Sequence, residues 1–467
     1  MAAHLARRAG FGATEPQLAA LVEMGREAAV SHFVDFPLDD TSLSDAIRDA
    51  GGDLSVIEFG TDAMENESTN DVVQRVRRWW LYRMVQGNHP LQEKLTLLWH
   101  DHFACQQSKI LRLEQYLGQN KMFRRNAAGS FRTLVTRVAE DPGMLTYLDN
   151  RLNETANPNE NWSRELLELF TLGVDNGYDQ QDVWELARVF TGWTTPDLNT
   201  AEFIFRPELH DATDKVLFGR PIKGRAGPEG VQEGYEALER ILDRPECATF
   251  LAFKLLGWFV THEPSAADAE RYGQIMRQHD GSIREALRAM FLSDAFYDEL
   301  EGAPFYRNPV EFVVSAARLL EIQNTHVFAL NHHTRLMGMD LFEPPSVAGW
   351  EHGEIWVNSS STVHRFNYAL DLSDLPHSRR TVAGRTVLNL DALAGAEGDD
   401  DMPHAELVDR LSRRLFQREI PSREAVIAFL DDADSWLEAG SSPRSKRRAK
   451  TRAAVHLLLT SPEFALA

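Results

Sequence analysis

The chain has 467 residues and a formal net charge of −21, from 49 Lys and Arg against 70 Asp and Glu. This acidic surplus argues against general nucleic-acid binding, which needs basic side chains to replace phosphate counterions. It also argues against adsorption to an anionic membrane surface. No stretch reaches the roughly 18 apolar residues that a membrane span requires. The 43% of hydrophobic residues is ordinary for a globular protein.

Two cysteines, Cys105 and Cys247, are too few for a disulfide scaffold or a Cys-rich zinc site. The pair Arg7-Arg8 could open an export signal, but Glu15 interrupts the apolar run that should follow it. We therefore expect a cytoplasmic protein, unless a signal precedes residue 1.

Helical periodicity dominates the chain, with apolar residues recurring three and four positions apart. Residues 72–86 form the first long segment of this kind, and residues 91–104 follow directly after Pro90. Residues 161–172 are followed by Gly173, which is typical of a helix end. Further helices are predicted at 111–139, 180–191, 231–242, 247–260, 267–278, 282–293, 309–321, 404–416 and 422–438.

Strand patterns are scarce. Residues 202–205 and 215–218 flank a polar turn, which predicts one small β-hairpin near residues 202–219. The fold class is therefore mainly α: a large multi-helix assembly with that hairpin. We expect a main helical domain over 1–371, a linker at 372–403 and a C-terminal helical segment at 404–467 that packs on the main domain. The acidic stretch 40–71 is predicted to be a polar insertion in the main domain.

The sequence Trp-His-Asp-His-Phe at 99–103 is the first candidate for chemistry, because imidazoles serve as metal ligands and general bases. His100 and His102 diverge by about 200° on a helix, so both can point inward only if the helix ends between them. The alternative is that both are polar caps at a helix C-terminus, where the dipole favours a cation.

A second candidate lies at 159–168, where Asn161, Glu165 and Glu168 share one helical face. Carboxylates on neighbouring helices build di-metal sites. The alternative is helix capping and ion pairing, with Arg164 as the partner of Glu168. The predicted metal ligands are His100, His102, Glu165 and Glu168. Because ELLELF is otherwise apolar, at least one of its two carboxylates should meet the interior.

Two further candidates are loops. His210 and Asp211 lie in the turn of the predicted hairpin, where they serve either function or ordinary turn chemistry. The segment 342–359 is rich in Pro, Gly and Trp and could line a pocket for a sugar or planar ligand; the alternative is a buried structural loop. The predicted catalytic residues are His100, His102, Glu165, His210 and Asp211. The predicted substrate-binding residues are Arg164, Trp193, Trp350, Trp356 and Asn358.

Eight segments in order resemble a large bacterial family of unknown function, the domain-of-unknown-function family 1800. They are HLARRAGFG at 4–12, LQEKLTLLWHDHF at 91–103, NENWSRELLELFTLGV at 159–174, YDQQDVWELARVFTGW at 178–193, His210-Asp211 with KVLFGR at 215–220, RNPVEFVVSAARLL at 307–320, MGMDLFEPPSVAGWEHGEIWVNSSS at 337–361 and LLLTSPEF at 457–464. The resemblance implies a helical fold and no defined activity. It also implies a partner, because relatives often accompany a second family related to sulfatases and alkaline phosphatases. Many relatives are exported, whereas this chain shows no signal.

Two functions follow as hypotheses. The first is an enzyme whose His and carboxylate side chains gather at a polar centre that could hold a divalent metal such as Zn, Fe or Mn. One carboxylate or imidazole would then act as general base on a metal-bound water. The second is a non-catalytic binding or assembly protein that acts with a sulfatase- or phosphatase-like partner. Segments 91–103 and 159–174 are predicted to pack together, because each has a broad apolar face.

Overall fold

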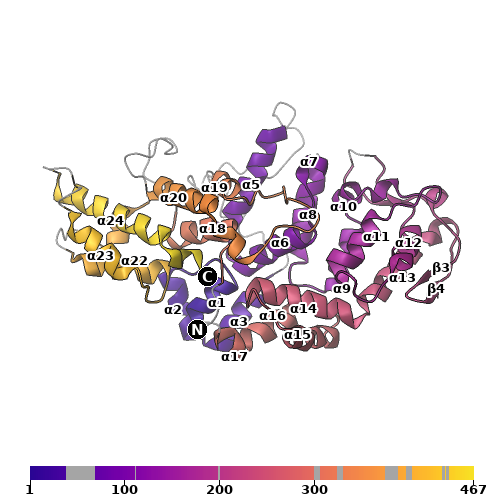
Figure 1. The fold of residues 1–467 in the computed structure, drawn as a ribbon, viewed down its shortest axis with the longest axis horizontal. Coiled ribbons are helices and arrows are strands. Elements are labelled where there is room, and N and C mark those ends of the chain that lie inside the picture. Colours follow the sequence, from indigo (N-terminus) through magenta and orange to yellow (C-terminus); the bar gives the residue numbers. More distant parts are fainter. Residues whose placement is uncertain are drawn as a thin grey trace.

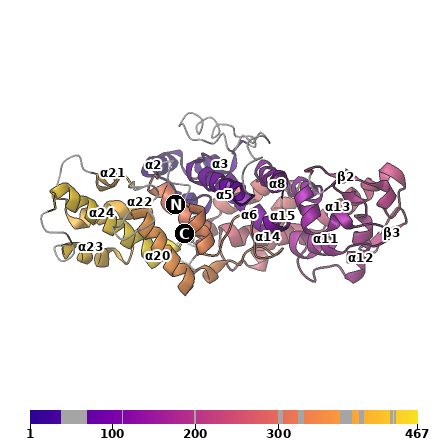
Figure 2. The ribbon, with the colours of Figure 1, turned by 90° about the horizontal axis from the view of Figure 1, so that it is seen from above.

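The computed structural model describes residues 1–37, 69–110, 112–197, 200–298, 305–322, 330–373, 388–395, 402–433, 437 and 441–467. They form an elongated, mainly helical molecule, which confirms the predicted fold class (Figure 1). The two chain ends lie close together near its middle in both ribbon views (Figures 1 and 2). Within these ranges, no helix is both long and apolar enough to cross a membrane.

One continuous hydrophobic core runs through the central and flanking helices. The central helices come from both halves of the chain: α1 (Ala2–Arg8), α2 (Glu15–Met24), α3 (Arg26–Val34), α5 (Thr69–Gln86), α6 (Pro90–His102), α7 (Gln107–Ile110), α8 (Leu113–Arg125), α14 (Pro245–Phe259), α15 (Ala266–Gln278), α16 (Ile283–Leu292), α17 (Asp294–Asp298), α18 (Pro309–Leu319) and α19 (Leu330–Leu336). The polar insertion predicted at 40–71 lies almost wholly outside the described residues.

Helix α6 is the axis of this central part. Pro90 begins it, in the first turn where a missing N–H costs nothing, and all 13 of its residues are buried. The buried residues include the charged side chains of Glu93 and Lys94, and a buried charge needs an oppositely charged partner. Glu93 accepts hydrogen bonds from Arg83 and Arg124 at 2.8 Å each, and Lys94 Nζ lies 2.7 Å from Glu311 Oε1. These pairs hold α6 to its neighbouring helices.

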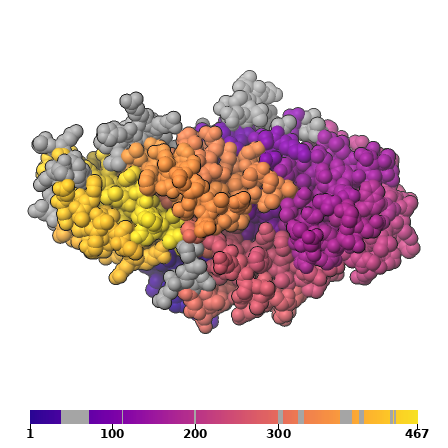
Figure 3. All heavy atoms as spheres, viewed as in Figure 1, coloured from indigo at the N-terminus to yellow at the C-terminus, as the bar shows by residue number. Residues whose placement is uncertain are grey.

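The end of the molecule drawn in magenta contains the middle of the chain (Figures 1 and 3). Its helices are α9 (Phe131–Ala139), α10 (Pro142–Tyr147), η2 (Asn150–Leu152), α11 (Asn161–Glu165), η3 (Leu166–Thr171), α12 (Gln180–Val189), η4 (Pro207–Leu209), η5 (Gly227–Gly230) and α13 (Val231–Leu242). Helix α11 continues into η3, which is a π-helix. There Leu172 N–H donates to Leu167 O, five residues back, at 3.0 Å.

The predicted packing of segments 91–103 and 159–174 is confirmed. The ring centroids of Phe103 and Phe170 are 5.2 Å apart, and His102 Nε2 lies 3.0 Å from the carbonyl oxygen of Phe170. The C-terminal end of α6 is therefore fastened to η3 by both apolar and polar contacts.

The strands form two small antiparallel sheets. Strand β1 (Trp193–Thr194) pairs with β2 (Ile204–Phe205), and β3 (Lys215–Leu217) pairs with β4 (Arg220–Ile222). Both predicted strand positions are occupied, but their predicted pairing with each other is wrong. Phe218 and Gly219 both have positive φ, 54° and 68°, which suits a two-residue hairpin turn and returns the chain onto β3 at once.

The opposite end contains α20 (Ser359–Ser373), α21 (Leu390–Ala394), α22 (His404–Leu415), α23 (Arg423–Asp431) and α24 (Pro443–Thr460). The short helix η8 (Gly353–Trp356) precedes this end, and η11 (Pro462–Ala465) follows it close to the C-terminus. Helix α24 packs on α20, so the C-terminal segment contacts the rest of the chain. The predicted linker 372–403 includes the end of α20 and all of α21, which packs on α24; its residues 374–387 and 396–401 lie outside the described ranges.

Candidate functional site

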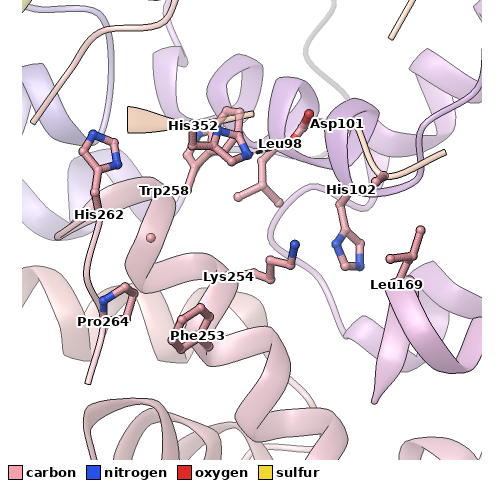
Figure 4. A pocket seen from close by; sticks show the side chains of 12 residues that line it. Leu98, Asp101, His102, Leu169, Phe253, Lys254, Trp258, His262, Pro264 and His352 are labelled. Carbon is pink, nitrogen blue, oxygen red and sulfur yellow. Dashed lines mark ion pairs between the residues drawn. The ribbon is translucent and has the colours of Figure 1, made fainter. Parts of the chain in front are cut away.

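A pocket of about 270 Å³ lies where α6, η3 and α14 meet the loops after α14 and after α19 (Figure 4). Its walls are apolar in part and also carry imidazoles, one carboxylate and one ammonium. The lining residues are Leu98, Asp101, His102, Leu169, Phe253, Lys254, Gly257, Trp258, His262, Pro264, Ala348 and His352.

Asp101 and His352 form a carboxylate–imidazole pair in this pocket. Asp101 Oδ2 lies 3.0 Å from His352 Nε2, and the two side chains are 9% and 44% exposed. Trp350 N–H donates to the other carboxylate oxygen at 2.7 Å. Because the carboxylate only accepts, Nε2 of His352 carries a proton, and in the neutral ring Nδ1 carries the lone pair.

Gly349 allows this loop to approach Asp101. Its φ is +79°, and a Cβ added there would lie 2.4 Å from the backbone oxygen of Asp101 and 2.5 Å from Oδ1. Those separations are far below van der Waals contact. The Gly-Trp-Glu-His sequence at 349–352 therefore delivers both the Trp350 N–H and the His352 ring to one carboxylate.

His102 enters the pocket from the last turn of α6. Its Nε2 must donate to the Phe170 carbonyl, 3.0 Å away, since a carbonyl oxygen only accepts. That carbonyl is available because η3 ends one residue later, leaving its last carbonyls without helical partners. Burial, reinforced by the charge of Lys254, lowers the pKa of His102 to about 3. The ring is therefore neutral at neutral pH and Nδ1 is an acceptor.

Lys254 projects from α14 toward the ring of His102 (Figure 4). The side chain of Lys254 is exposed to solvent, and it also forms part of the pocket wall. The partial desolvation of the ammonium by the surrounding protein lowers the pKa of Lys254, and the negative charge of Asp101 partly opposes this shift. Lys254 Nζ also lies 5.5 Å from the ring centroid of Phe250.

His262 lies in the loop after α14. Tyr306 N–H donates to its Nε2 at 3.0 Å, so in the neutral ring the proton is on Nδ1. The ring stacks on Phe305, with centroids 4.0 Å apart. Burial, and then the positive charge of Arg8, lower the pKa of His262 to about 4. The pocket thus holds an imidazole acceptor at His102 and an imidazole donor at His262.

The other residues predicted to carry chemistry lie elsewhere. His100 is one residue from Asp101 but points away into the core: Phe342 N–H donates to its Nε2 at 3.0 Å, and it packs on Trp80 and Trp350. Burial, with Arg77 nearby, lowers the pKa of His100 to about 3. As the helical geometry requires, His100 and His102 point in different directions and contact different residues.

Two of the three carboxylates at 160–168, those of Glu160 and Glu168, form a half-exposed ion-pair network with Arg164. Arg164 contacts Glu160 at 2.7 Å and Glu168 at 3.2 Å, which confirms the predicted pairing of Arg164 with Glu168. Glu165 is half-buried, and burial followed by the nearby charge of Glu168 raises its pKa. None of the three carboxylates lines the pocket.

His210 and Asp211 belong to a separate cluster beside β3. His210 Nε2 lies 3.3 Å from Glu233 Oε1, and the fully buried Lys215 contacts the same carboxylate. Asp211 accepts from Arg188 at 2.8 Å. Burial opposes ionisation of Asp211, but hydrogen bonds from Thr213 and Arg188 lower its pKa to about 2. These contacts fasten the loop between the two sheets.

The four residues predicted to bind a substrate through aromatic or amide groups lie outside the pocket lining. Trp193 is fully buried in β1 and Trp356 is buried in η8. Trp350 is buried beside Asp101 and acts there through its backbone N–H. Asn358 caps α20, since its Oδ1 accepts from Ser361 N–H at 2.9 Å. Trp356 and Asn358 thus fit the structural interpretation of the 342–359 loop.

The predicted metal ligands are not assembled into a centre. His100 and His102 face different neighbours, Glu168 pairs with Arg164, and Glu165 is half-buried beside that pair. Across the described ranges, no group of three or more His, Cys, Asp or Glu side chains is arranged to hold a metal ion.

Sequence reasoning placed His102 among the functional residues and missed Asp101, Lys254, His262 and His352 as site residues. Asp101 lay within the motif that was recognised at 99–103, and His352 lay two residues after Trp350 in the recognised loop. A prediction that these two segments lie next to each other would have identified the Asp101–His352 pair. Lys254 and His262 occupy an apolar helix and its following turn, where no motif marks them.

Comparisons with known proteins agree with the sequence motifs. Residues 4–466 match the family model described as "Protein of unknown function (DUF1800)". No curated protein and no solved structure matched the chain. Because the match covers nearly the whole chain, the protein belongs to the DUF1800 family.

Proposed function

We propose that the protein is an enzyme that carries out general acid–base catalysis in the pocket between α6 and α14. The observation that carries the proposal is the 3.0 Å contact between Asp101 Oδ2 and the partly exposed His352. A carboxylate that orients an imidazole, and stabilises the imidazolium it becomes, is a recurring device for taking protons at neutral pH. Here it opens onto a cavity large enough for a small ligand.

The positions of the protons on the pocket side chains suggest a role for each residue. His352 keeps its Nε2 proton on Asp101, so Nδ1 would take the proton from water or from the substrate. Lys254 supplies the positive charge of the pocket and would bind an anionic group of the substrate. Among the described lining residues none is Ser, Thr or Cys. A water molecule, or the carbon acid of the substrate itself, is therefore the expected proton donor to His352.

The test compares turnover by the wild type with His352→Gln and Asp101→Asn. Chromogenic carboxylic, phosphoric and sulfuric esters, glycosides and a carbon-acid exchange assay in deuterated water cover the reaction classes open to such a base. Loss of a general base typically costs about 10²–10⁴-fold in rate. Asp101→Asn should lower kcat similarly, because the amide can favour the wrong imidazole tautomer.

A matched control is available at the surface. His404 Nδ1 lies 2.7 Å from Asp431 Oδ1, a His–Asp pair outside the pocket, so His404→Gln should leave turnover unchanged. Equal turnover by His352→Gln and the wild type would contradict the proposal. So would the absence of turnover in every class.

A second function, assembly with another protein, has one supporting observation. Ile355, Val357, Val363 and Phe366 expose large apolar side chains on η8 and α20 and the residues between them, and exposed apolar groups often mark contact surfaces. Under this proposal a sulfatase- or phosphatase-like protein would co-purify with the wild type but not with the Val363→Ser, Phe366→Ser double variant. Val22→Ser, an exposed valine on α2, is the control.

A further inference from the structure

We infer that the pocket binds a small organic carboxylate with an apolar body, and that the Lys254 ammonium is the group that holds the carboxylate. This inference rests on the proposed function, because it names the substrate class of the same pocket. Three observations carry it: the pairing of charges, the composition of the walls and the size of the cavity.

The ammonium of Lys254 has no carboxylate of its own. Across the described residues, no acidic side chain lies within ion-pair distance of Lys254 Nζ, whereas Lys94, Lys109, Lys215 and Lys223 each contact one. The other described lysines without a carboxylate partner, Lys121, Lys446 and Lys450, do not line the pocket. Asp101 shares the pocket but is engaged by the Trp350 N–H and by His352. A cation partly enclosed by protein and lacking a counter-charge favours an anionic ligand, since charge-assisted hydrogen bonds are the strong ones.

The surroundings of Lys254 are apolar. Leu98, Leu169, Phe253, Trp258 and Pro264 line the same cavity, and Phe253, next to Lys254 on α14, is 43% exposed. A ligand whose anionic group meets Lys254 would therefore place its remaining atoms against carbon. The volume of about 270 Å³ lies near the lower end for small-molecule sites, so that body is short.

The charged groups and hydrogen-bond donors of the pocket favour a carboxylate ligand over a phosphate. Lys254 is the single Lys or Arg among the described lining residues, whereas phosphate sites gather several cationic or backbone N–H donors. Asp101 adds a negative charge that would oppose a dianion more than a monoanion. His102 presents an acceptor, not a donor, beside Lys254. His262 Nδ1–H is the one neutral imidazole donor that the geometry leaves for a second oxygen.

The experiment measures binding of hexanoate, benzoate, hexanol and inorganic phosphate to the full chain by calorimetry and NMR. The variants are Lys254→Met and, as control, Lys223→Met, which removes a surface lysine paired with Asp214. Lys254→Met should weaken hexanoate and benzoate binding about tenfold or more, as expected for a hydrogen bond to a charged group. Lys254→Met should leave the affinity for hexanol unchanged, and Lys223→Met should bind all four ligands with the affinities of the wild type. Thermal unfolding of both variants checks that each is folded.

Three results would overturn the inference: no carboxylate binding to the wild type, equal carboxylate affinity in Lys254→Met, or tighter binding of phosphate than of hexanoate. His352→Gln separates this inference from the proposed function. It should bind hexanoate as the wild type does, because Lys254 holds the anion, while it loses turnover. Retained turnover with intact carboxylate binding would contradict the proposed function alone, and lost binding in Lys254→Met would then still support the anion site.

Discussion

Replacing His100 with glutamine should make the protein less sensitive to acid. The His100 imidazole is 2% exposed and accepts the Phe342 N–H at 3.0 Å. A glutamine Oε1 can accept the same hydrogen bond without titrating. The variant therefore removes a buried titratable group and leaves the N–H with a partner, which avoids the cost of a buried unsatisfied donor.

The size of the effect follows from the pKa shift. Burial, and then the charge of Arg77, lower the pKa of His100 from 6.5 to about 3 in the folded protein. Between these values the unfolded chain binds a proton that the folded chain refuses, so stability falls as pH falls from 6.5 toward 3. At about pH 5, 1.5 units below the unfolded value, the loss is about 2 kcal/mol at about 1.36 kcal/mol per unit.

The assay is urea-induced unfolding of the wild type and His100→Gln at about pH 7.5 and about pH 5. The wild type should lose about 2 kcal/mol more than the variant between the two conditions. Phe342→Leu is the control, since it disturbs the same packing but removes no titratable group and should keep the acid sensitivity of the wild type. Equal losses in wild type and His100→Gln would refute the reasoning.

Two other substitutions test the surroundings of the pocket. Glu93→Gln should lower the free energy of unfolding by about 3–5 kcal/mol, because Arg83 and Arg124 would stay buried without a counter-charge. The control Glu239→Gln, which loses an exposed ion pair with Arg132, should lower it by about 0–1 kcal/mol. Similar losses in the two variants would contradict the argument from burial. Gly349→Ala should cost more stability than Gly219→Ala and should also lower turnover: both glycines have positive φ, but a Cβ at 349 meets Asp101 whereas nothing lies within 4 Å at 219. Equal unfolding midpoints for the two alanine variants would show that the loop at 349 yields without disturbing Asp101.

The sequence predicted helices better than strands, for a local reason. The face of α6 was readable from Leu91, Leu95 and Leu98, and its start from Pro90, all within one segment. Strand pairing depends on where the chain turns. The turn was predicted in the polar stretch before Lys215, whereas the chain turns at Phe218 and Gly219. The two predicted strands therefore do not pair with each other, and each has another partner.

The site was only partly predictable because its members meet in space and not in sequence. His102 and Asp101 lie in one motif, but His352 comes from a loop about 250 positions later and approaches only because Gly349 lets it. Lys254 sits in the segment AFKLLGWF, where a single charge among apolar residues is equally typical of a helix face that meets solvent. The carboxylates at 165 and 168 had a clearer helical spacing, and that spacing serves Arg164.

The π-helix at Leu166–Thr171 makes the pocket sensitive to chain length as well as to side-chain identity. A π-turn holds one more residue than the α-turn it replaces, so deleting a single residue there would allow the segment to rewind as α-helix. Each residue of an α-helix advances the next side chain by about 100°, and Leu169 and the Phe170 carbonyl would then swing away from His102. Relatives that share this pocket should therefore keep the residue count of this turn, and an insertion or deletion within it would mark a branch of the family in which His102 has lost its hydrogen bond to residue 170.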